Sequence, residues 1–490
     1  MNVVVALDAG TTGVRAIAFG HDGLTVASAY REFPQHFPAP GWVEHDTDEI
    51  GEALDAVCAE LAATLDGHRI AAIGITDQRE TIVAWDRATG RPLHRAIVWQ
   101  DRRTTETCER LEAEGALSEV RATTGLVLDP YFSGTKAAWL FTEGGVPMDR
   151  SVALGTIDSW VVWRLTDGAV HVTDVSNASR TMLLDIATGS WSAAMCDLLG
   201  VPMHVLPEVV RSCGRVGLTS SSCPLGAGIP ISGIAGDQQA SLFGQACFAP
   251  GDTKVTCGTG AFVLMNVGEH IPPPVDGLLT TIAWSLPDRP MTYAYEGSVF
   301  VTGAAVQWLR DGLGIIERSA EVNALAASVP DSGGVVMVPA FTGLGSPWWD
   351  PHARGAVLGI TRGTTAAHLA RATVESIALQ TRDVVDAMSA GSGRAVASLR
   401  ADGGGASDLV LQLQADQLGV PVQRPVVAET TALGAAYLAG LAEGMWDSPD
   451  DIVANWQCEH HAEPADDRTH IEELHSRWLR AVGRARGTTN

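Results

Sequence analysis

Short apolar runs alternate with amphipathic stretches along most of this chain. Six of the apolar runs predict buried strands, because they are short and rich in β-branched residues; they are RIAAIGIT, TIVAWD, RAIVWQ, IPISGIAG, TKVTCGTGAFVLMNVG and GVVMVPAF. Apolar residues at helical spacing predict helices over residues 49–65 and 471–482. In the second helix the expected apolar face is Ile471, Leu474, Trp478, Leu479 and Val482. This alternation predicts an α/β fold.

The chain opens with a strand-like run over residues 3–7, followed by Asp8 and the sequence Gly-Thr-Thr-Gly. One interpretation is a tight hairpin with a polar tip. The other is a ligand site, because a glycine turn exposes amides and hydroxyls that can bind phosphate. Asp8 could then hold a magnesium ion. This stretch alone leaves both interpretations open.

The same pattern recurs in the second half of the chain. The segment VTCGTGAFVLMN again sets Gly-Thr-Gly between apolar strands, and a third glycine cluster, ADGGGAS, lies between an apolar run and an apolar helix. Amides at a helix start favour anions or nucleotides. We therefore expect two related lobes, residues 1–245 and 246–490, that present glycine-threonine hairpins to a shared cleft.

Composition and charge exclude several classes of protein. The net charge of −24, without a long basic run, argues against nucleic-acid binding. The N-terminus lacks the basic region of a signal peptide, and no apolar stretch is long enough to span a bilayer. We therefore expect a cytoplasmic protein without membrane insertion. We also expect a homo-oligomer, either a dimer or a tetramer.

The cysteines and the missing motifs narrow the chemistry further. Eight scattered cysteines form no C-x-x-C pair, so we expect reduced thiols, and we interpret Cys458-Glu-His-His as a solvated loop. Neither lysine, Lys136 or Lys254, lies in a P-loop motif. The fingerprints G-x-G-x-x-G, H-E-x-x-H and G-x-S-x-G are absent from the sequence as well.

Asp237 is the candidate general base. It follows the strand-like IPISGIAG and precedes a short apolar helix. It could simply cap that helix. Alternatively, its carboxylate could take the proton from an alcohol that attacks a γ-phosphate, since phosphoryl transfer needs mainly positioning and charge neutralisation.

Arg79 and Glu80 follow the strand-like IAAIGIT directly, where an open α/β sheet presents ligand groups. The guanidinium could donate to one hydroxyl of a polyol while the carboxylate accepts from its neighbour. The alternative is an ordinary surface ion pair. Trp99, Tyr131 and Phe262 are either core or interface aromatics, or they line a small polyol.

Twelve segments in order, over about nine-tenths of the chain, resemble the FGGY carbohydrate kinases; they are ALDAGTTGVRA, FPQHFPAPGWVEHD, IGITDQRETIVAWD, AIVWQDRR, TGLVLDPYFSGTKAAW, GTIDSWVVWRL, HVTDVSNASRTML, IPISGIAGDQQASLFGQACF, GTGAFVLMN, EGSVFVTGAAVQWLRDGL, PAFTGLGSPWWDP and ETTALGAAYLAGL. The resemblance implies two ribonuclease-H-like lobes of the actin and hexokinase type, with ATP and Mg²⁺ between them. It also implies transfer of phosphate from ATP to a terminal hydroxyl of glycerol.

The resemblance carries over residue by residue. Asp237 matches the catalytic base. Asp237 would also face the magnesium ion, and Asp8 would contact this ion through a water molecule. The implied polyol site is Arg79, Glu80, Trp99, Tyr131, Asp237, Gln238 and Phe262. The implied nucleotide site is Thr11, Thr12, Gly13, Arg15, Thr259, Gly303, Gln307, Gly404 and Ser407.

The sequence departs from the family at two places. Ala9, Gly13 and Val14 replace polar residues of the first hairpin, and Ser407 stands where the family has an asparagine beside adenine. The second departure puts nucleotide affinity and choice in question. Two alternatives therefore stay open: a kinase for another short polyol, such as erythritol or threitol, and a non-catalytic nucleotide- or polyol-binding regulator on the same fold.

Overall fold

The computed structural model describes residues 1–487, and two mixed sheets form its framework. The first sheet has the order β3-β2-β1-β5-β14-β13; its strands are β1 (Asn2–Ala9), β2 (Gly13–Phe19), β3 (Thr25–Glu32), β5 (Arg69–Asp77), β13 (Cys213–Leu218) and β14 (Pro230–Gly236). The second has the order β17-β18-β16-β15-β21-β22-β23; its strands are β15 (Thr253–Cys257), β16 (Ala261–Gly268), β17 (Leu279–Trp284), β18 (Thr292–Val299), β21 (Leu399–Asp402), β22 (Val422–Pro425) and β23 (Cys458–Ala462).

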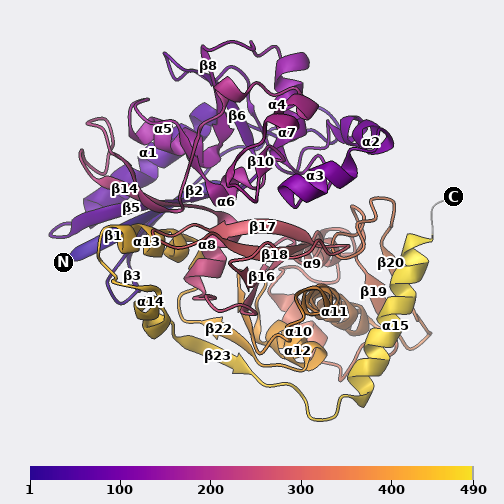
Figure 1. Cartoon of the computed structure of the whole chain (residues 1–490). Helices are drawn as coiled ribbons and strands as arrows, with labels where there is room; N and C mark the ends of the chain where they lie inside the picture. Colours follow the sequence, from indigo (N-terminus) through magenta and orange to yellow (C-terminus); the bar gives the residue numbers. More distant parts are fainter. Residues whose placement is uncertain (488–490) are drawn as a thin grey trace.

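The two sheets repeat one topology. In each, an antiparallel hairpin, β1–β2 or β15–β16, is followed by a parallel neighbour of its first strand, β5 or β21. A further parallel strand comes next, β14 or β22. Figure 1 shows the N-terminal half above and the C-terminal half below. The predicted fold, α/β with two related lobes of the ribonuclease-H-like type, is confirmed.

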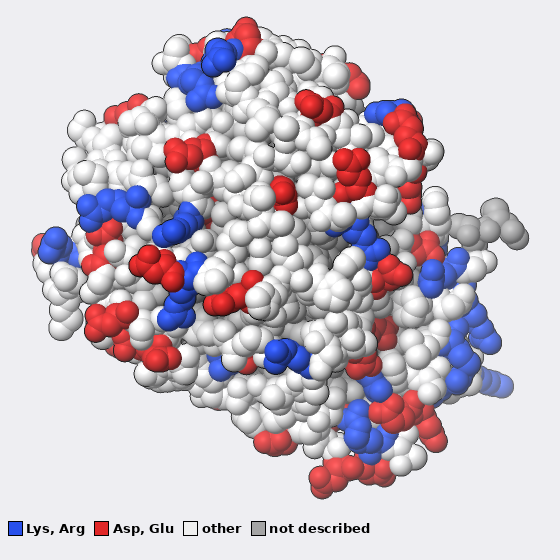
Figure 2. Space-filling view, viewed as in Figure 1, with Lys and Arg blue, Asp and Glu red and all other residues white. Residues whose placement is uncertain are grey.

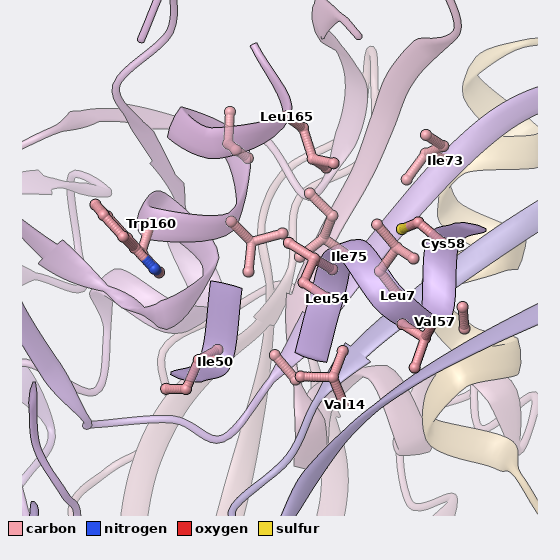
Figure 3. Close-up of a cluster of buried hydrophobic side chains, with 14 of the residues drawn as sticks. Leu7, Val14, Ile50, Leu54, Val57, Cys58, Ile73, Ile75, Trp160 and Leu165 are labelled. Atoms are coloured by element: carbon pink, nitrogen blue, oxygen red, sulfur yellow. The ribbon is translucent and has the colours of Figure 1, made fainter. Parts of the chain in front are cut away.

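The core of the first lobe forms where helix α1 (Thr47–Thr64) packs on β2 and β3. Asp46 caps this helix by accepting a hydrogen bond from the amide of Asp48. Its apolar face, with Ile50, Leu54 and Val57, is buried against strand residues such as Leu7. Figure 3 shows these side chains meeting in one cluster.

The remaining elements of the first half surround this core. The short strands are β4 (Glu44–His45), β6 (Ile82–Asp86), β7 (Ala96–Ile97), β8 (Val152–Thr156), β9 (Val172–Asp174), β10 (Leu184–Asp185), β11 (Ser190–Trp191) and β12 (Glu208–Val210). The helices are α2 (Thr105–Ala113), α3 (Leu117–Thr124), α4 (Ser133–Thr142), α5 (Ile157–Leu165), α6 (Val175–Ala178), α7 (Ala193–Leu199) and α8 (Asp237–Gly244), with a 3₁₀ turn at Met203–Val205.

The second half adds seven helices and one small ribbon among the described residues. The helices are α9 (Gly303–Asp311), α10 (Glu321–Ala327), α11 (Ala366–Ser392), α12 (Asp408–Leu418), α13 (Thr430–Ala442), α14 (Pro449–Asn455) and α15 (Thr469–Arg486). The ribbon pairs β19 (Val336–Val338) with β20 (Ala356–Leu358).

Helix α13 ties the end of the chain to its beginning, because it packs on β1, β5, β14 and α8 (Figure 1). The approach is close enough to require glycine on both sides. A Cβ at Gly74 would lie 2.1 Å from the carbonyl oxygen of Ala435, and one at Gly434 would lie 1.8 Å from that of Ala240. A helix late in the sequence therefore completes the core of the first sheet.

Two local expectations were wrong, and one predicted strand is shorter than expected. Leu479 is 42% exposed, so the buried face of α15 consists of Ile471, Leu474, Trp478 and Val482, joined by Ala481 and Ala485. Cys458 begins the edge strand β23, not a loop. The run RAIVWQ forms only the two-residue strand β7.

The cysteines are unpaired, and the surface carries charges of both signs. Seven of the eight cysteines are buried, and all eight are free thiols. Figure 2 shows acidic and basic side chains interspersed on one face, with basic ones gathered at the edge where α15 lies. Within residues 1–487, none of the helices combines the length and apolar character that a membrane span requires.

Candidate active site

Each of the two sheets carries one glycine-threonine turn. In the first, Gly10 N donates to Gly13 O at 3.0 Å, which leaves Thr11 and Thr12 at the tip between β1 and β2. In the second, Gly258 N donates to Gly260 O at 2.8 Å, and Thr259 is exposed between β15 and β16. Both turns therefore have the same closing bond and the same kind of residue at the tip.

Gly13 and Arg15 continue the first turn into β2. A Cβ at Gly13 would lie 2.5 Å from the backbone carbonyl oxygen of Arg31 on the neighbouring strand β3, so only glycine fits here. The guanidinium of Arg15 lies 5.1 Å from the centre of the Tyr30 ring and forms an ion pair with Glu429. Arg15 is thus held beside the turn from two sides.

Asp8 lies opposite Arg15 in the β1–β2 ladder. Burial raises the pKa of its carboxyl to about 7; Arg15 opposes this shift, and the negative charges of Asp237 and Glu429 add to it. A carboxylate in such surroundings is stabilised by an added cation.

Arg79 is the centre of a buried polar cluster. Its Nη1 donates to Gln239 Oε1 at 3.1 Å, its Nη2 donates to Tyr131 Oη at 3.3 Å, and both nitrogens reach Glu296. The side chain is only 2% exposed. The alternative interpretation of Arg79 and Glu80 as a surface ion pair is therefore wrong.

Glu80 stands beside Arg79 in a left-handed backbone conformation, with φ of 63°. Its Oε1 accepts from Arg180 Nε at 2.6 Å. Burial raises the pKa of Glu80 although Arg79 and Arg180 work against the shift. The carboxylate is thus enclosed and directed by two cations.

Asp237 is the first residue of α8, and the N-cap is Gly236. The capping interpretation is therefore wrong, although Oδ1 of Asp237 does accept from the amide of Gln238 at 2.8 Å. The same oxygen lies 3.1 Å from Arg79 Nε. About a third of the Asp237 side chain stays exposed, so a reactant can approach this carboxylate.

Three aromatic side chains close one side of this cluster. The ring of Trp99 meets Tyr131 edge to face at 5.6 Å and Phe262 at 6.4 Å. Its Nε1 donates to Thr11 Oγ1 at 3.0 Å. Trp99 therefore connects the polyol residues to the first turn.

Apart from Thr259, the predicted nucleotide residues of the second lobe lie on α9 and between β21 and α12. Gly303 begins α9 against the second turn, where its amide donates to Gly258 O at 3.1 Å, and Gln307 is exposed one turn later. Gly404 is exposed after β21. Ser407 caps α12 and donates from Oγ to Asn323 Oδ1 at 2.9 Å, so the hydroxyl proton of Ser407 is already committed.

Sequence reasoning missed four residues of the site. Arg180 and Glu296 complete the cluster around Arg79, Gln239 accepts from Arg79, and Lys136 donates to the carbonyls of Pro130, Tyr131 and Phe132. A glutamate inside the apolar strand TYAYEGSV and a lysine inside the apolar helix SGTKAAWLFT were the available signals. Charged side chains are rarely buried unless they are paired.

The donor set fits a magnesium ion and nucleotide phosphates. The described residues contain no group of three His, Cys, Asp or Glu side chains that could hold a metal alone. Magnesium does not need such a cage, since it keeps several waters and binds one or two carboxylates together with substrate phosphates. Asp8, whose charge is disfavoured as it stands, and Asp237 match that requirement.

Comparisons with known proteins point to one family. Its models, the N-terminal and C-terminal domains of the FGGY family of carbohydrate kinases, match residues 3–244 and 253–443. A glycerol kinase of Trichlorobacter lovleyi is 55% identical over 494 residues, and one of Ralstonia nicotianae is 54% identical over 493, with 99% of each chain covered. The crystal structure of Plasmodium falciparum glycerol kinase with ADP is 35% identical, with a TM-score of 0.92, over 99% of this chain and 98% of that one. These similarities extend over nearly the whole chain.

Proposed function

Because the chain belongs to the FGGY family of carbohydrate kinases, we propose that it transfers the γ-phosphate of ATP to a terminal hydroxyl of glycerol, giving sn-glycerol 3-phosphate and ADP. One observation carries the proposal beyond the family. Arg79, Tyr131 and Glu296 come from both lobes into one hydrogen-bonded cluster, and Asp237 forms an ion pair with Arg79 while its carboxylate stays partly exposed.

Within this proposal, Arg79 and Glu80 bind neighbouring hydroxyls of glycerol, the first as donor and the second as acceptor. Tyr131 and Gln238 contribute further hydrogen bonds, and Trp99 and Phe262 cover the carbon skeleton. This set offers polar partners on one side and aromatic rings on the other. It suits a short polyol, because every hydroxyl of the polyol needs a hydrogen-bond partner once it leaves water.

The chemical step uses Asp237 as general base. Its carboxylate takes the proton of the terminal hydroxyl while that oxygen forms a bond to the γ-phosphorus, and the bond from this phosphorus to the β-phosphate bridging oxygen breaks. Arg79, 3.1 Å from Asp237, keeps the base oriented. Amides of the two turns, with Thr11, Thr12, Gly13, Thr259 and Arg15, hold the phosphates.

Magnesium, held by Asp8 and Asp237, would neutralise the charge on the transferred phosphate. Gly303, Gln307, Gly404 and Ser407 would line the nucleoside.

We further propose a lobe boundary after Gln245. We also propose a homo-oligomer of two or four chains, whose mass light scattering after size-exclusion chromatography would measure.

The test of the site is Asp237→Asn. The variant should bind glycerol in calorimetry but lose nearly all turnover, because the amide cannot accept the proton. Asp386→Asn, at an exposed aspartate of α11, is the matched control and should keep wild-type turnover. Near wild-type turnover of Asp237→Asn would remove Asp237 as the base.

A further inference from the structure

Lys254 reaches from one lobe to a predicted substrate residue of the other. It lies on β15, the strand that leads into the second glycine-threonine turn, and it is fully buried. Its Nζ donates to Gln238 Oε1 at 2.6 Å and to Thr256 Oγ1 at 2.8 Å. Gln238 lies in the first turn of α8, immediately after Asp237.

The contact fixes which way the Gln238 amide is turned. An ammonium group has three donors and no acceptor, so the Gln238 atom that faces it must be the carbonyl oxygen. Nε2 of Gln238 then carries two free donors. Within residues 1–487 this nitrogen makes no hydrogen bond, and it is not among the fully enclosed polar atoms that lack a partner.

The neighbouring glutamine shows the contrast. Gln239 is used at both ends: its Oε1 accepts from Arg79, and its Nε2 donates to Thr281 Oγ1 and to the carbonyl of Ile282. Gln238 is 6% exposed and engaged at its oxygen only. Its free donors therefore remain available to a ligand beside Asp237.

Keeping a charge at this position is costly. Burial lowers the pKa of Lys254 to about 8, while Asp402 and Asp237 act in the opposite direction. An apolar side chain of similar volume would avoid this desolvation cost. The presence of a buried ammonium that donates a hydrogen bond to Gln238 is therefore better explained by its effect on the Gln238 amide than by packing.

We propose that Lys254 is a positioning residue of the polyol site: it holds the Gln238 carbonyl inward, so that Gln238 meets the polyol only as a hydrogen-bond donor. The inference rests on the proposed function of the site. It predicts that Gln238 accepts no hydrogen bond from a substrate hydroxyl, and that a substrate oxygen with a free lone pair faces its Nε2.

A double-mutant cycle tests this inference. Lys254→Met should raise the KM for glycerol about tenfold while the KM for ATP changes less than about twofold. In a Gln238→Leu background, the same Lys254→Met change should alter the glycerol KM less than about twofold, because no amide is left to orient. Additive effects of the two changes would overturn the proposal.

Two further variants separate positioning from general support of β15. Lys254→Arg should give a glycerol KM between those of Lys254→Met and the wild type, because a guanidinium is also only a hydrogen-bond donor. Thr256→Val removes the other partner of Lys254 and should stay within about threefold of wild type. A glycerol KM for Thr256→Val as high as that of Lys254→Met would contradict the proposal.

A variant that keeps Lys254 covers the case in which Lys254→Met does not fold. Gln238→Glu pairs with Lys254 and offers no donor, so it should raise the glycerol KM as well, and a wild-type KM would refute the inference. Absence of glycerol-dependent turnover in the wild-type protein would instead refute the proposed function.

Discussion

Arg79 and Glu296 form a bidentate ion pair between the two lobes. Nη1 of Arg79 lies 2.5 Å from Oε2 of Glu296, and Nη2 lies 3.0 Å from Oε1. Burial by itself would raise the pKa of Glu296, but Arg180 and Arg79 outweigh it and lower that pKa. The arginine predicted to bind the polyol is thus oriented by a strand of the opposite sheet.

Glu296→Gln should destabilise the protein, because Arg79 and Arg180 would keep buried charges with one carboxylate fewer. We expect the free energy of unfolding to fall by about 3 kcal/mol in urea titrations at neutral pH. The lowered pKa means that this contribution is present above the usual glutamate pKa and is lost as the pH falls through the folded value. Glu321→Gln, in a more exposed pair with Arg318, is the control and should leave the free energy of unfolding close to that of wild type; equal losses would contradict the role of Glu296.

Trp99→Phe should raise the KM for both ATP and glycerol. It removes the 3.0 Å bond to Thr11 and keeps an aromatic ring against Tyr131. A lost hydrogen bond of about 1 kcal/mol predicts KM increases of about fivefold for both ATP and glycerol in steady-state assays. Trp139→Phe, whose indole bonds the exposed Glu143, is the control and should change neither KM. An effect of Trp99→Phe on one substrate alone would show that the link is unimportant.

Asp8→Asn should separate stability from activity. Because the pKa of Asp8 in the folded protein is raised to about 7, its charge increasingly disfavours folding as the pH rises from the usual aspartate value to about 7. The variant should therefore melt at a higher temperature than wild type at about pH 8, with a smaller difference at about pH 5, in thermal denaturation without nucleotide. It should also lose turnover. A melting difference that does not change with pH would be inconsistent with this assignment.

Lys136→Met should disturb the loop that presents Tyr131. Lys136 donates to three carbonyls at 2.6–2.9 Å and is fully buried. Leaving these carbonyls without donors should cost about 3 kcal/mol of unfolding free energy. The glycerol KM should rise about tenfold, with little change for ATP, and wild-type kinetics would show that the loop holds its shape without Lys136.

Much of the framework was predictable from local pattern. Ligand groups gather at the carboxyl ends of strands, and this rule predicted the positions of Arg79 and Asp237. The repeated Gly-Thr-Gly predicted two related lobes. Both signals are carried by a few adjacent residues. Arg180 and Glu296 were not predicted, because Arg180 bonds both Glu80 and Glu296 across 100 or more residues of sequence. Helix α13 is apolar and small-residue-rich all round, so its periodicity does not say which sheet it covers.

The local errors have similar causes. Leu479 adjoins the buried Trp478 but lies at the border of the helical face, where periodicity does not distinguish buried from exposed positions. The strand that contains Cys458 lies at a sheet edge, and its polar, mostly exposed side chains give no strand signal. Tertiary position decides both cases.

The most direct test of the central claim is ADP release at saturating ATP and magnesium with glycerol, erythritol, threitol, ribitol or water as acceptor. The account predicts strong stimulation by glycerol and little by the others, which would also show that Ser407 is tolerated beside the nucleotide. Preference for a four-carbon polyol would contradict the proposed substrate, and no stimulation by any acceptor would contradict the kinase itself in favour of a non-catalytic binding protein.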